Sequence, residues 1–515
     1  MKFLVYSEIT AARIASSLGM SEYSYYFVLR DFLPVLQKLG QVVVVENPEV
    51  EVDAHYEAAC AAGERCLFLS FSPPHKTTLG LRCPTLPVFA WEFDSIPNES
   101  WLDEPEQDWR HALRLCGSGI VHSELTAQAV KQVLGEDFPV IAIPSPVWDK
   151  FHGFRDAPAL PLVQPMRLHL TSGVVLDTHD VALEPYMPGL DAVARAVQNA
   201  RIPQEADKAK PAAQQAAAES RLHISLRYFG EWYRQVLCGL LPALPQRRRA
   251  PVPAPAPVEP EAPSGPRLEP INQVEPAGIQ ACKPGMPEWT AGECSVELSG
   301  VVFTALFNPY DGRKNWVDML TAFCAAFRDN PDATLLFKLG HHEYQAALNG
   351  MLMCIARLPK FKCRIVMLHG YLEKAEFDNL IKASTFAVNA SHGEGQCLPL
   401  MELMSCGKPA IAPRHSAMLD YINEDVAFIV DSWLDATAWP HDPRLAYRTC
   451  RHQLDWASLV EAYRAAYHCA RHEPERYLAM ASAAIERLRT HCSRDVAKQR
   501  LVQFLQLKEH ANEPV

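Results

Sequence analysis

The first third of the chain alternates short apolar runs with longer segments of helical periodicity. In the longer segments, hydrophobic residues recur at steps of three and four, whereas the short runs are continuously apolar. Strands that alternate with helices are typical of a parallel, doubly wound α/β sheet. The predicted strands are 3–6, 42–45, 66–71, 86–90, 119–121 and 140–143, and the predicted helices are 25–39, 109–115 and 126–134.

The same alternation returns in the C-terminal part of the chain, which predicts a second doubly wound sheet there. The last part, 456–507, has the pattern of a largely helical segment. The predicted strands of this second region are 301–307, 334–339, 364–368, 386–389 and 410–411, and its predicted helices are 316–327 and 344–358.

The composition changes between the two regions. Residues 212–218 are only Ala and Gln, and 251–257 carry Pro at every second position. Such a segment buries too little apolar surface to offset its ordering entropy, so we predict a long, partly disordered insertion. The predicted domains are 1–163, the insertion 164–297, a second α/β domain 298–480, and a C-terminal helical segment 481–515.

One part of this insertion, 221–241, has the periodicity of an amphipathic helix with arginines among its polar residues. A helix of this length spans roughly 32 Å. It has two interpretations: it lies in a membrane interface as a peripheral contact, or it packs onto the protein itself, which we favour.

The four residues Ser-Gly-Val-Val occur on both sides of the insertion, at 172–175 and at 299–302. One hypothesis is that these two edges pair as strands, so that the insertion loops out between them. The alternative is that so short a match arises by chance.

Charge and composition exclude several classes of function. The net charge of −11 argues against nucleic-acid binding, which needs a basic face. No apolar run approaches the roughly 18 residues of a membrane span, and residues 1–8 lack the pattern of a signal peptide. Fifteen cysteines without a C-x-x-C pair favour reduced thiols. We therefore expect a cytoplasmic protein.

The most informative motif is the stretch 392–407, in which Glu394 and Glu402 stand eight residues apart. Gly393 and Gly395 flank the first acid, and Pro399 suits the first turn of a helix. A helix start offers free N–H groups to a phosphate, and nearby carboxylates accept hydrogen bonds from hydroxyl groups. Phosphate and hydroxyls together are typical of a nucleotide sugar.

A second motif, 308–316, joins a predicted strand to a predicted helix and contains Arg313 and Lys314. Ligands of doubly wound sheets bind at such carboxyl ends of strands. Arg can donate hydrogen bonds to two phosphate oxygens at once, and Lys acts as a point charge. Together they can neutralise a diphosphate without a metal ion.

These two motifs resemble those of the retaining glycosyltransferases of family 4, which have the GT-B fold: two Rossmann-like, doubly wound domains that face each other across a cleft. The resemblance implies that 1–163 is the acceptor-side domain and that 298–480 binds the nucleotide sugar. It implies that Glu394 contacts the donor sugar, with Gly395 beside it, that Glu402 contacts the ribose, and that Arg313 and Lys314 hold the diphosphate. The sequence departs from the family at Gln396-Cys397, where an aromatic residue and a glycine are usual.

Residues of the first domain are weaker candidates for catalysis and donor binding. Gly19 follows the first strand and is similar to a glycine of the family's loop that faces the acceptor and the donor phosphate; the alternative is a plain turn between strand and helix. Glu92 and Asp94 follow the strand 86–90, where better-known members have a histidine; this resembles a bacterial polysaccharide subgroup with a tryptophan–glutamate signature. His75 is a candidate to supply the catalytic imidazole in place of that histidine.

Two candidates lie in the second domain. Lys338, near the end of strand 334–339, is a further candidate for a phosphate contact. The N–H groups that follow strand 410–411, at 415–417, can cap a phosphate.

We therefore predict a hexosyltransferase-type enzyme that moves a sugar from a nucleoside-diphosphate sugar to a saccharide or lipid-linked acceptor in surface polysaccharide or glycolipid synthesis. The donor is a substrate, and no cofactor and no metal are expected, because no Asp-x-Asp pair is placed to chelate a cation. Two rivals remain: a non-catalytic sugar-nucleotide-binding scaffold, and an epimerase or phosphorylase of the same fold.

Overall fold

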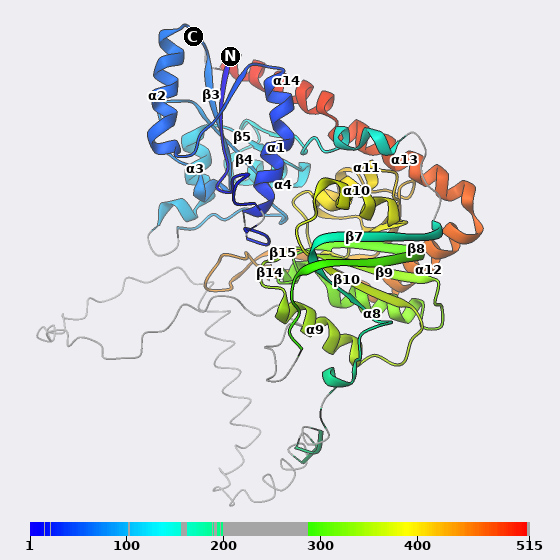
Figure 1. Cartoon of the computed structure of the whole chain (residues 1–515). Helices are drawn as coiled ribbons and strands as arrows, with labels where there is room; N and C mark the ends of the chain where they lie inside the picture. The colour runs from blue at the N-terminus through cyan, green and yellow to red at the C-terminus, as the bar shows by residue number, and fades with distance from the viewer. Residues whose placement is uncertain are drawn as a thin grey trace, which may run out of the picture. The chain divides into compact units, whose positions relative to one another are not determined.

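The computed structural model describes residues 1–187, except 15, 21, 101–103 and 156–161, and residues 287–511, with a few positions between 189 and 198. The predicted helix 221–241 lies outside the described residues. Figure 1 shows two α/β regions, one formed by the first third of the chain and the other by residues beyond the insertion. No helix in the described part of the chain combines the length and the apolar character that a membrane crossing needs.

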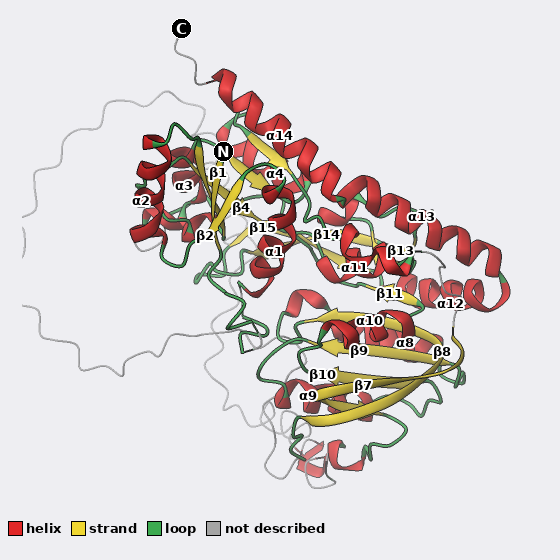
Figure 2. Cartoon of the chain, turned by 45° about the horizontal axis from the view of Figure 1, so that its top comes forward, coloured by secondary structure: helices red, strands yellow, loops and turns green. Residues whose placement is uncertain are grey.

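The first region contains one fully parallel six-stranded sheet with the order β2-β1-β3-β4-β5-β6. Its core strands β1, β3 and β4 are apolar and buried, as expected for strands covered on both faces. Figures 1 and 2 show α1 and α2 on opposite sides of this sheet. The elements are β1 (Lys2–Tyr6), α1 (Tyr23–Gln37), β2 (Gln41–Val44), α2 (Pro48–Ala61), β3 (Cys66–Phe71), β4 (Thr85–Phe89), α3 (Trp109–Cys116), β5 (Gly119–Val121), α4 (Glu124–Leu134) and β6 (Val140–Ala142).

The second region contains a seven-stranded sheet in which β13, β12, β11, β8, β9 and β10 run parallel and β7 is antiparallel. The expected pair of doubly wound α/β domains is thus confirmed. The elements are β7 (Leu162–Asp177), β8 (Gly292–Phe307), α8 (Trp316–Ala326), β9 (Ala333–Leu339), α9 (Gln345–Ala356), β10 (Arg364–His369), α10 (Lys374–Ala383), β11 (Phe386–Val388), α11 (Leu398–Ser405), β12 (Ala410–Pro413) and β13 (Ala427–Val430).

Strand β7 corrects the predicted domain boundary at 163/164, because that boundary falls inside it. β7 pairs with both β8 and β10, so residues 164–177 belong to the second sheet and not to the insertion. Strands β7 and β8, which contain the two Ser-Gly-Val-Val segments, do pair, but the segments themselves do not lie opposite each other: Gly173 lies opposite Gly292, and Gly300 lies opposite Leu162. Hydrogen bonding between strands distant in sequence leaves no local signal, which is why the boundary was misplaced.

Three helices close the chain, α12 (Trp456–His472), α13 (Pro474–Cys492) and α14 (Arg494–Ala511). The predicted boundary at 480/481 is wrong, because it falls inside α13. Figure 1 shows α14, in red, returning beside α1 of the first domain. Ala497, Leu501 and Phe504 of α14 complete the apolar core of that domain. The first domain is therefore built from both ends of the chain.

Candidate active site

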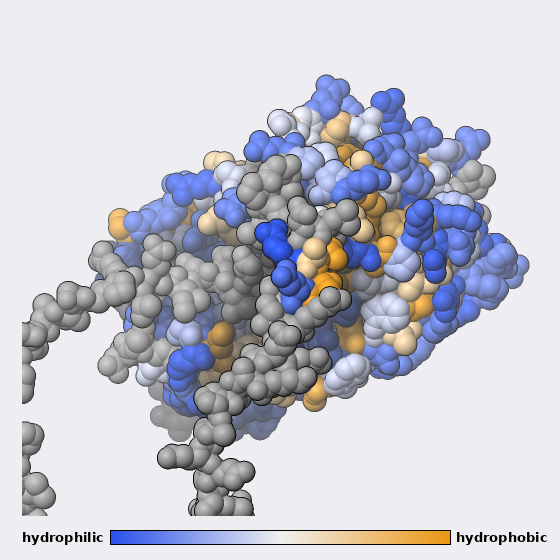
Figure 3. All heavy atoms as spheres, turned by 90° about the horizontal axis from the view of Figure 1, so that it is seen from below, coloured by the Kyte–Doolittle hydropathy of each residue, from blue (hydrophilic) through white to orange (hydrophobic). Residues whose placement is uncertain are grey.

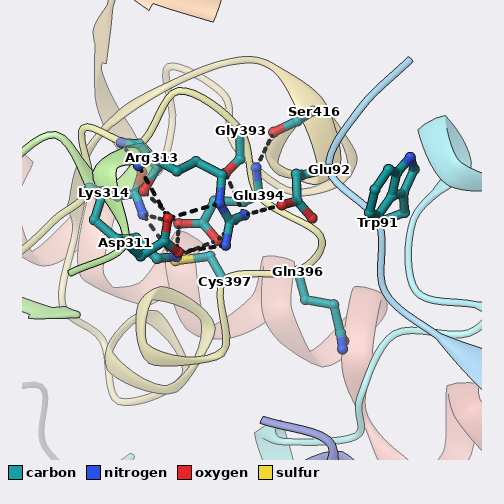
Figure 4. Close-up of polar contacts among 12 residues, drawn as sticks. Trp91, Glu92, Asp311, Arg313, Lys314, Gly393, Glu394, Gln396, Cys397 and Ser416 are labelled. Atoms are coloured by element: carbon teal, nitrogen blue, oxygen red, sulfur yellow. Dashed lines mark hydrogen bonds and ion pairs between the residues drawn. The ribbon is translucent and has the colours of Figure 1, made fainter. Parts of the chain in front are cut away.

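The candidate side chains gather at the carboxyl ends of parallel strands from both domains. Glu92 follows β4, Arg313 and Lys314 follow β8, and Glu394 follows β11. This edge is where ligands bind in doubly wound sheets. Figure 4 shows these four side chains pointing toward one another, together with Asp311.

Glu394 is the buried centre of this group, with only 3% of its surface exposed. Lys314 Nζ lies 2.8 Å from its Oε1 and 2.9 Å from its Oε2. Ser391 Oγ and Asn389 Nδ2 donate to Oε1 at 2.6 and 3.0 Å. The carboxylate is therefore fixed in one orientation by four donated hydrogen bonds.

Arg313 connects the two domains. Its Nη1 lies 3.1 Å from Glu92 Oε1 of the first domain and donates to the carbonyl of Gly393 at 3.0 Å. Its Nη2 donates to Asp311 at 2.8 Å, and its Nη1 lies 4.0 Å from Glu394 Oε2. The guanidinium thus contacts three carboxylates, which uses its planar fork of donors fully.

The charges of this cluster shift one another's pKa values. Burial by itself would raise the pKa of Glu394, but Lys314 and Arg313 outweigh it and hold that pKa at about 2. Burial also raises the pKa of Glu92, an effect that Arg313 opposes without cancelling. Glu394 is therefore firmly ionised at neutral pH, and Glu92 is the one of the three carboxylates around Arg313 whose pKa is shifted upward.

The glycines of the main motif permit close contact between the domains. A Cβ on Gly395 would lie 2.9 Å from the Cβ of Ala90 and 3.1 Å from the backbone nitrogen of Trp91. A Cβ on Gly393 would lie 3.2 Å from the carbonyl oxygen of Glu92. The loop after β11 thus packs directly against the loop after β4, and the predicted donor contact of Gly395 stays a prediction.

Gln396 and Cys397, which follow Gly395, shape the start of α11 and its contact with the first domain. Gln396 Oε1 accepts a hydrogen bond from the backbone N–H of Ser145 at 2.8 Å, which ties the second domain to the first. Cys397 is the N-cap of α11 and has φ 63°, in the left-handed region that favours glycine. The chain thus accepts backbone strain at a position whose conformation suits glycine.

Glu402 lies in α11, and its carboxylate contacts a lysine of the first domain. Lys150 Nζ lies 2.8 Å from Glu402 Oε1 and 2.7 Å from Asp31 Oδ2. Burial raises the pKa of Asp31 to about 6, against the opposing charge of Lys150. The structure therefore places Glu402 in a buried Asp31–Lys150–Glu402 triad, and its predicted contact with a ribose stays a prediction.

Gly19 has φ 86° and lies against the second domain. A side chain there would meet His341, whose Cα would lie 2.8 Å from the added Cβ. Asn308 Nδ2 donates to the carbonyl of Gly19 at 3.0 Å. The predicted glycine loop thus lies beside the motif that contains Arg313.

Lys338 lies in β9, and it is the one residue of this strand that is only partly buried. Burial lowers its pKa to about 8. Ammonium groups in such an environment gain from an anionic ligand. Lys338 therefore remains a candidate for a phosphate contact.

His75 occupies an aromatic cluster. Its Nδ1 accepts a hydrogen bond from Trp109 Nε1 at 3.1 Å, and its ring stacks on His441 with centroids 5.5 Å apart. Burial lowers the pKa of His75, which favours the neutral imidazole. Among the described residues, none of its hydrogen bonds joins it to the Glu394 cluster. These contacts indicate a packing role, and catalysis by His75 stays an untested prediction.

The loop after β12 supports Glu394 through its backbone. Ser416 Oγ accepts a hydrogen bond from the N–H of Glu394 at 2.9 Å, and the N–H of Ala417 donates to the carbonyl of Glu394 at 3.1 Å. The N–H of Ala417, one of the groups expected to cap a phosphate, is thus used to hold the main motif.

Sequence reasoning missed several residues of this site. Asp311, Asn389 and Ser391 orient Arg313 and Glu394, and their position directly after strands was the available signal. Lys150 had no such signal, because it meets Glu402 only through the tertiary fold.

Solved structures resemble the chain over most of its length. HepE from Anabaena in complex with UDP has 12% sequence identity and a TM-score of 0.45, over 98% of this chain and 100% of that chain. Sucrose-phosphate synthase from Thermosynechococcus elongatus has 12% identity and a TM-score of 0.46, over 99% and 100%. A glycosyltransferase from Rickettsia africae has 9% identity and a TM-score of 0.45, over 99% of both chains.

No curated protein matches the sequence of this chain. A family model does match residues 300–439, which include Arg313, Lys314, Glu394 and Glu402. This part of the chain therefore matches the domain of the family described as Glycosyl transferases group 1.

Proposed function

We propose that the protein transfers a sugar from a nucleoside-diphosphate sugar to an acceptor hydroxyl, with retention of the anomeric configuration. The observation that carries the proposal is the convergence of Glu394, Arg313 and Lys314 within the stretch that matches Glycosyl transferases group 1. The cations would hold the diphosphate, and Glu394 would accept hydrogen bonds from the sugar hydroxyls.

The reaction breaks the bond between the anomeric carbon and the diphosphate oxygen and forms a bond to the acceptor oxygen on the same face. The acceptor proton passes to the leaving diphosphate, so no strong protein base is required. Positioning and charge stabilisation would supply most of the rate enhancement. No metal ion and no cofactor are part of this proposal.

Both cations of the cluster are paired with carboxylates. A diphosphate would therefore have to share or displace these partners. Lys314 is paired with Glu394, which is the expected ligand of the sugar. It would therefore exchange part of its contact with Glu394 for a contact with the phosphate. Arg313 would keep Asp311, because that carboxylate contacts both Nε and Nη2 of the guanidinium.

We further propose a saccharide or lipid-linked acceptor, a role in surface polysaccharide or glycolipid synthesis and a cytoplasmic location. The tryptophan–glutamate signature Trp91-Glu92, which lies against the loop of Glu394, supports a polysaccharide-type acceptor. The expected membrane contact through 221–241 has its own test: full-length protein and a deletion of 205–250 would be sedimented with anionic lipid vesicles. Equal sedimentation would exclude that contact.

The experiment is a thermal-shift panel of nucleotide sugars, followed by transfer assays with the donor that stabilises the protein most. Ligand at a hundred times its Kd adds about 2.7 kcal/mol to stability, which is readily detected. We expect Glu394→Gln to retain the fold and to lose at least a hundredfold in kcat, on the order expected for loss of an oriented polar group. Undiminished turnover in that variant would exclude Glu394 from the reaction.

A second candidate function is that of a non-catalytic protein that binds sugar nucleotides, which the same cations and carboxylates would also serve. Such a protein predicts a thermal shift with a nucleotide sugar but neither transfer nor hydrolysis of the donor. The same panel therefore separates the two functions. An epimerase would instead interconvert the nucleotide sugar without an acceptor.

A further inference from the structure

An antiparallel hairpin formed by β14 (Ser432–Ala438) and β15 (Tyr447–Leu454) follows the second sheet without joining it. Residues 432–454, here called the β14–β15 hairpin, contact both domains of the described chain. One set of contacts reaches the first domain directly after Glu92. The other reaches the loop that contains Glu394.

Trp439, between the two strands of the hairpin, is inserted into the core of the first domain. Its side chain is only 1% exposed and belongs to the same apolar cluster as Trp91 and Trp109. Its Nε1 donates to the carbonyl of Ser95 at 3.3 Å, and Trp91 Nε1 donates to the same carbonyl at 2.7 Å. The hairpin is therefore anchored beside the loop that contains Glu92.

Asp94 adds a polar anchor two residues after Glu92. Its Oδ1 accepts hydrogen bonds from Thr449 Oγ1 at 2.7 Å and from the backbone N–H of Cys450 at 3.1 Å. Hydrogen bonds to an ionised carboxylate are stronger than those between neutral groups. Asp94 thus fixes the middle of β15 to the first domain.

The end of β15 forms hydrogen bonds with the motif 392–407, which contains Glu394. The N–H of His452 donates to the carbonyl of His392 at 2.8 Å, and His392 Nδ1 donates to the carbonyl of His452 at 2.8 Å. His392 stands two residues before Glu394. Strand β15 therefore contacts Asp94 of the first domain through 449–450 and His392 of the second domain through 452, only two to three positions further along.

We propose that the β14–β15 hairpin is a clamp that holds the two domains together and that Asp94 is a positioning residue. Asp94 acts through its hydrogen bonds to Thr449 and Cys450. These bonds hold Glu92, two residues earlier, against Arg313 and Glu394. The Arg313–Glu92 contact at 3.1 Å crosses the domains, so it depends on what fixes their separation. A displacement of about 1 Å at a reacting centre can cost a hundredfold in rate. This role in the reaction rests on the proposed function; the mechanical coupling does not.

The mechanical coupling is tested by amide hydrogen exchange of the full-length, unliganded protein, measured on peptides that contain 389–396 and 448–454. We expect Asp94→Ala to speed exchange in both peptides about tenfold, because a lost hydrogen bond to a charged group costs on this scale. Asp94→Asn keeps an oxygen acceptor and should restore protection. Asp435→Asn, on the hairpin but paired with Arg451, is the matched control and should leave both peptides unchanged.

Unchanged exchange in 389–396 for both Asp94→Ala and Thr449→Val would overturn the proposal. Equal acceleration in all peptides would also overturn it, because that result indicates general destabilisation. Where transfer activity is found, Asp94→Ala should lower kcat about tenfold with little change in the donor KM, and Asp94→Asn should restore it. Accelerated exchange in a protein without activity would reject the proposed function and leave the clamp intact.

Discussion

Lys314 Nζ lies within hydrogen-bond distance of both carboxylate oxygens of Glu394, at 2.8 and 2.9 Å, although the two residues are 80 positions apart in the sequence. Both side chains are largely withdrawn from solvent, with exposed side-chain fractions of 17% and 4%. A buried pair of this kind is costly to break by removing one partner, because the other charge is left uncompensated. The relationship therefore links the candidate chemistry to the stability of the fold.

The first prediction concerns this pair. Glu394→Gln and Lys314→Met should each lower the free energy of unfolding by about 3 kcal/mol, and the double variant should lose clearly less than the sum. Urea denaturation at neutral pH measures all four proteins. The pair Lys374–Asp378, with an N–O distance of 2.7 Å and an exposed lysine, is the control, and Lys374→Met should cost less than about 1 kcal/mol. Additive losses at 314 and 394 would contradict the coupling.

The second prediction is a loss of stability in acid. The pKa of Glu394 is about 2 in the folded protein, below its ordinary value of 4.5. As the pH falls, the unfolded chain therefore binds the proton first, so this stabilisation is complete above pH 4.5 and is lost as the pH falls toward 2. The loss is on the order of 3 kcal/mol. Glu394→Gln should show a correspondingly shallower decline, and parallel curves for the two proteins would argue against the shift.

The third prediction concerns Lys338, whose pKa burial lowers to about 8 from 10.5. Below pH 8 the folded protein carries the full cost of this buried charge, and stability from this group rises as the pH increases from 8 to 10.5. Lys338→Met should therefore stabilise the unliganded protein at pH 7 by roughly 1–3 kcal/mol. The same change should weaken binding of a nucleoside diphosphate, measured by calorimetry. Unaltered affinity would remove Lys338 from the donor site.

The fourth prediction tests the backbone at Cys397, with φ 63°. Cys397→Gly should leave the melting temperature the same or raise it slightly, because glycine adopts this conformation without a Cβ penalty. Cys397→Val should lower stability by roughly 1–3 kcal/mol, since a β-branched residue is most strained there. Equal melting temperatures for the two variants would show that the loop relaxes.

The fifth prediction concerns the contact between the domains at Gly395. An added methyl group would meet Ala90 and the backbone nitrogen of Trp91, so Gly395→Ala should displace the loop of Glu394. We expect at least a tenfold loss of donor affinity with a modest change in melting temperature. Gly153→Ala is the control, because an added Cβ meets no heavy atom within 4 Å. Normal donor affinity in Gly395→Ala would mean that the contact is dispensable.

Local patterns predicted much of the fold. The buried strands β3 and β5 begin and end at the predicted residues, because a continuous apolar run between polar segments is a signal within a few residues of sequence. Strand β7 was missed, because Pro165 and its polar residues conceal a strand whose partners lie in β8 and β10. The hairpin 432–454 escaped prediction for a related reason: its exposed strands have no continuous apolar run.

The sequence by itself determined that the chain has two doubly wound sheets and that Glu394, Arg313 and Lys314 lie where such sheets bind ligands, since strand ends and helix starts are local features. Only the tertiary structure decided which side chains form ion pairs with these residues. It paired Lys314 with Glu394, Arg313 with Glu92, and Glu402 with Lys150, a residue of no distinctive motif. Ion pairs and hydrogen bonds form between groups that folding brings within a few ångströms, and spacing along the chain does not encode that distance.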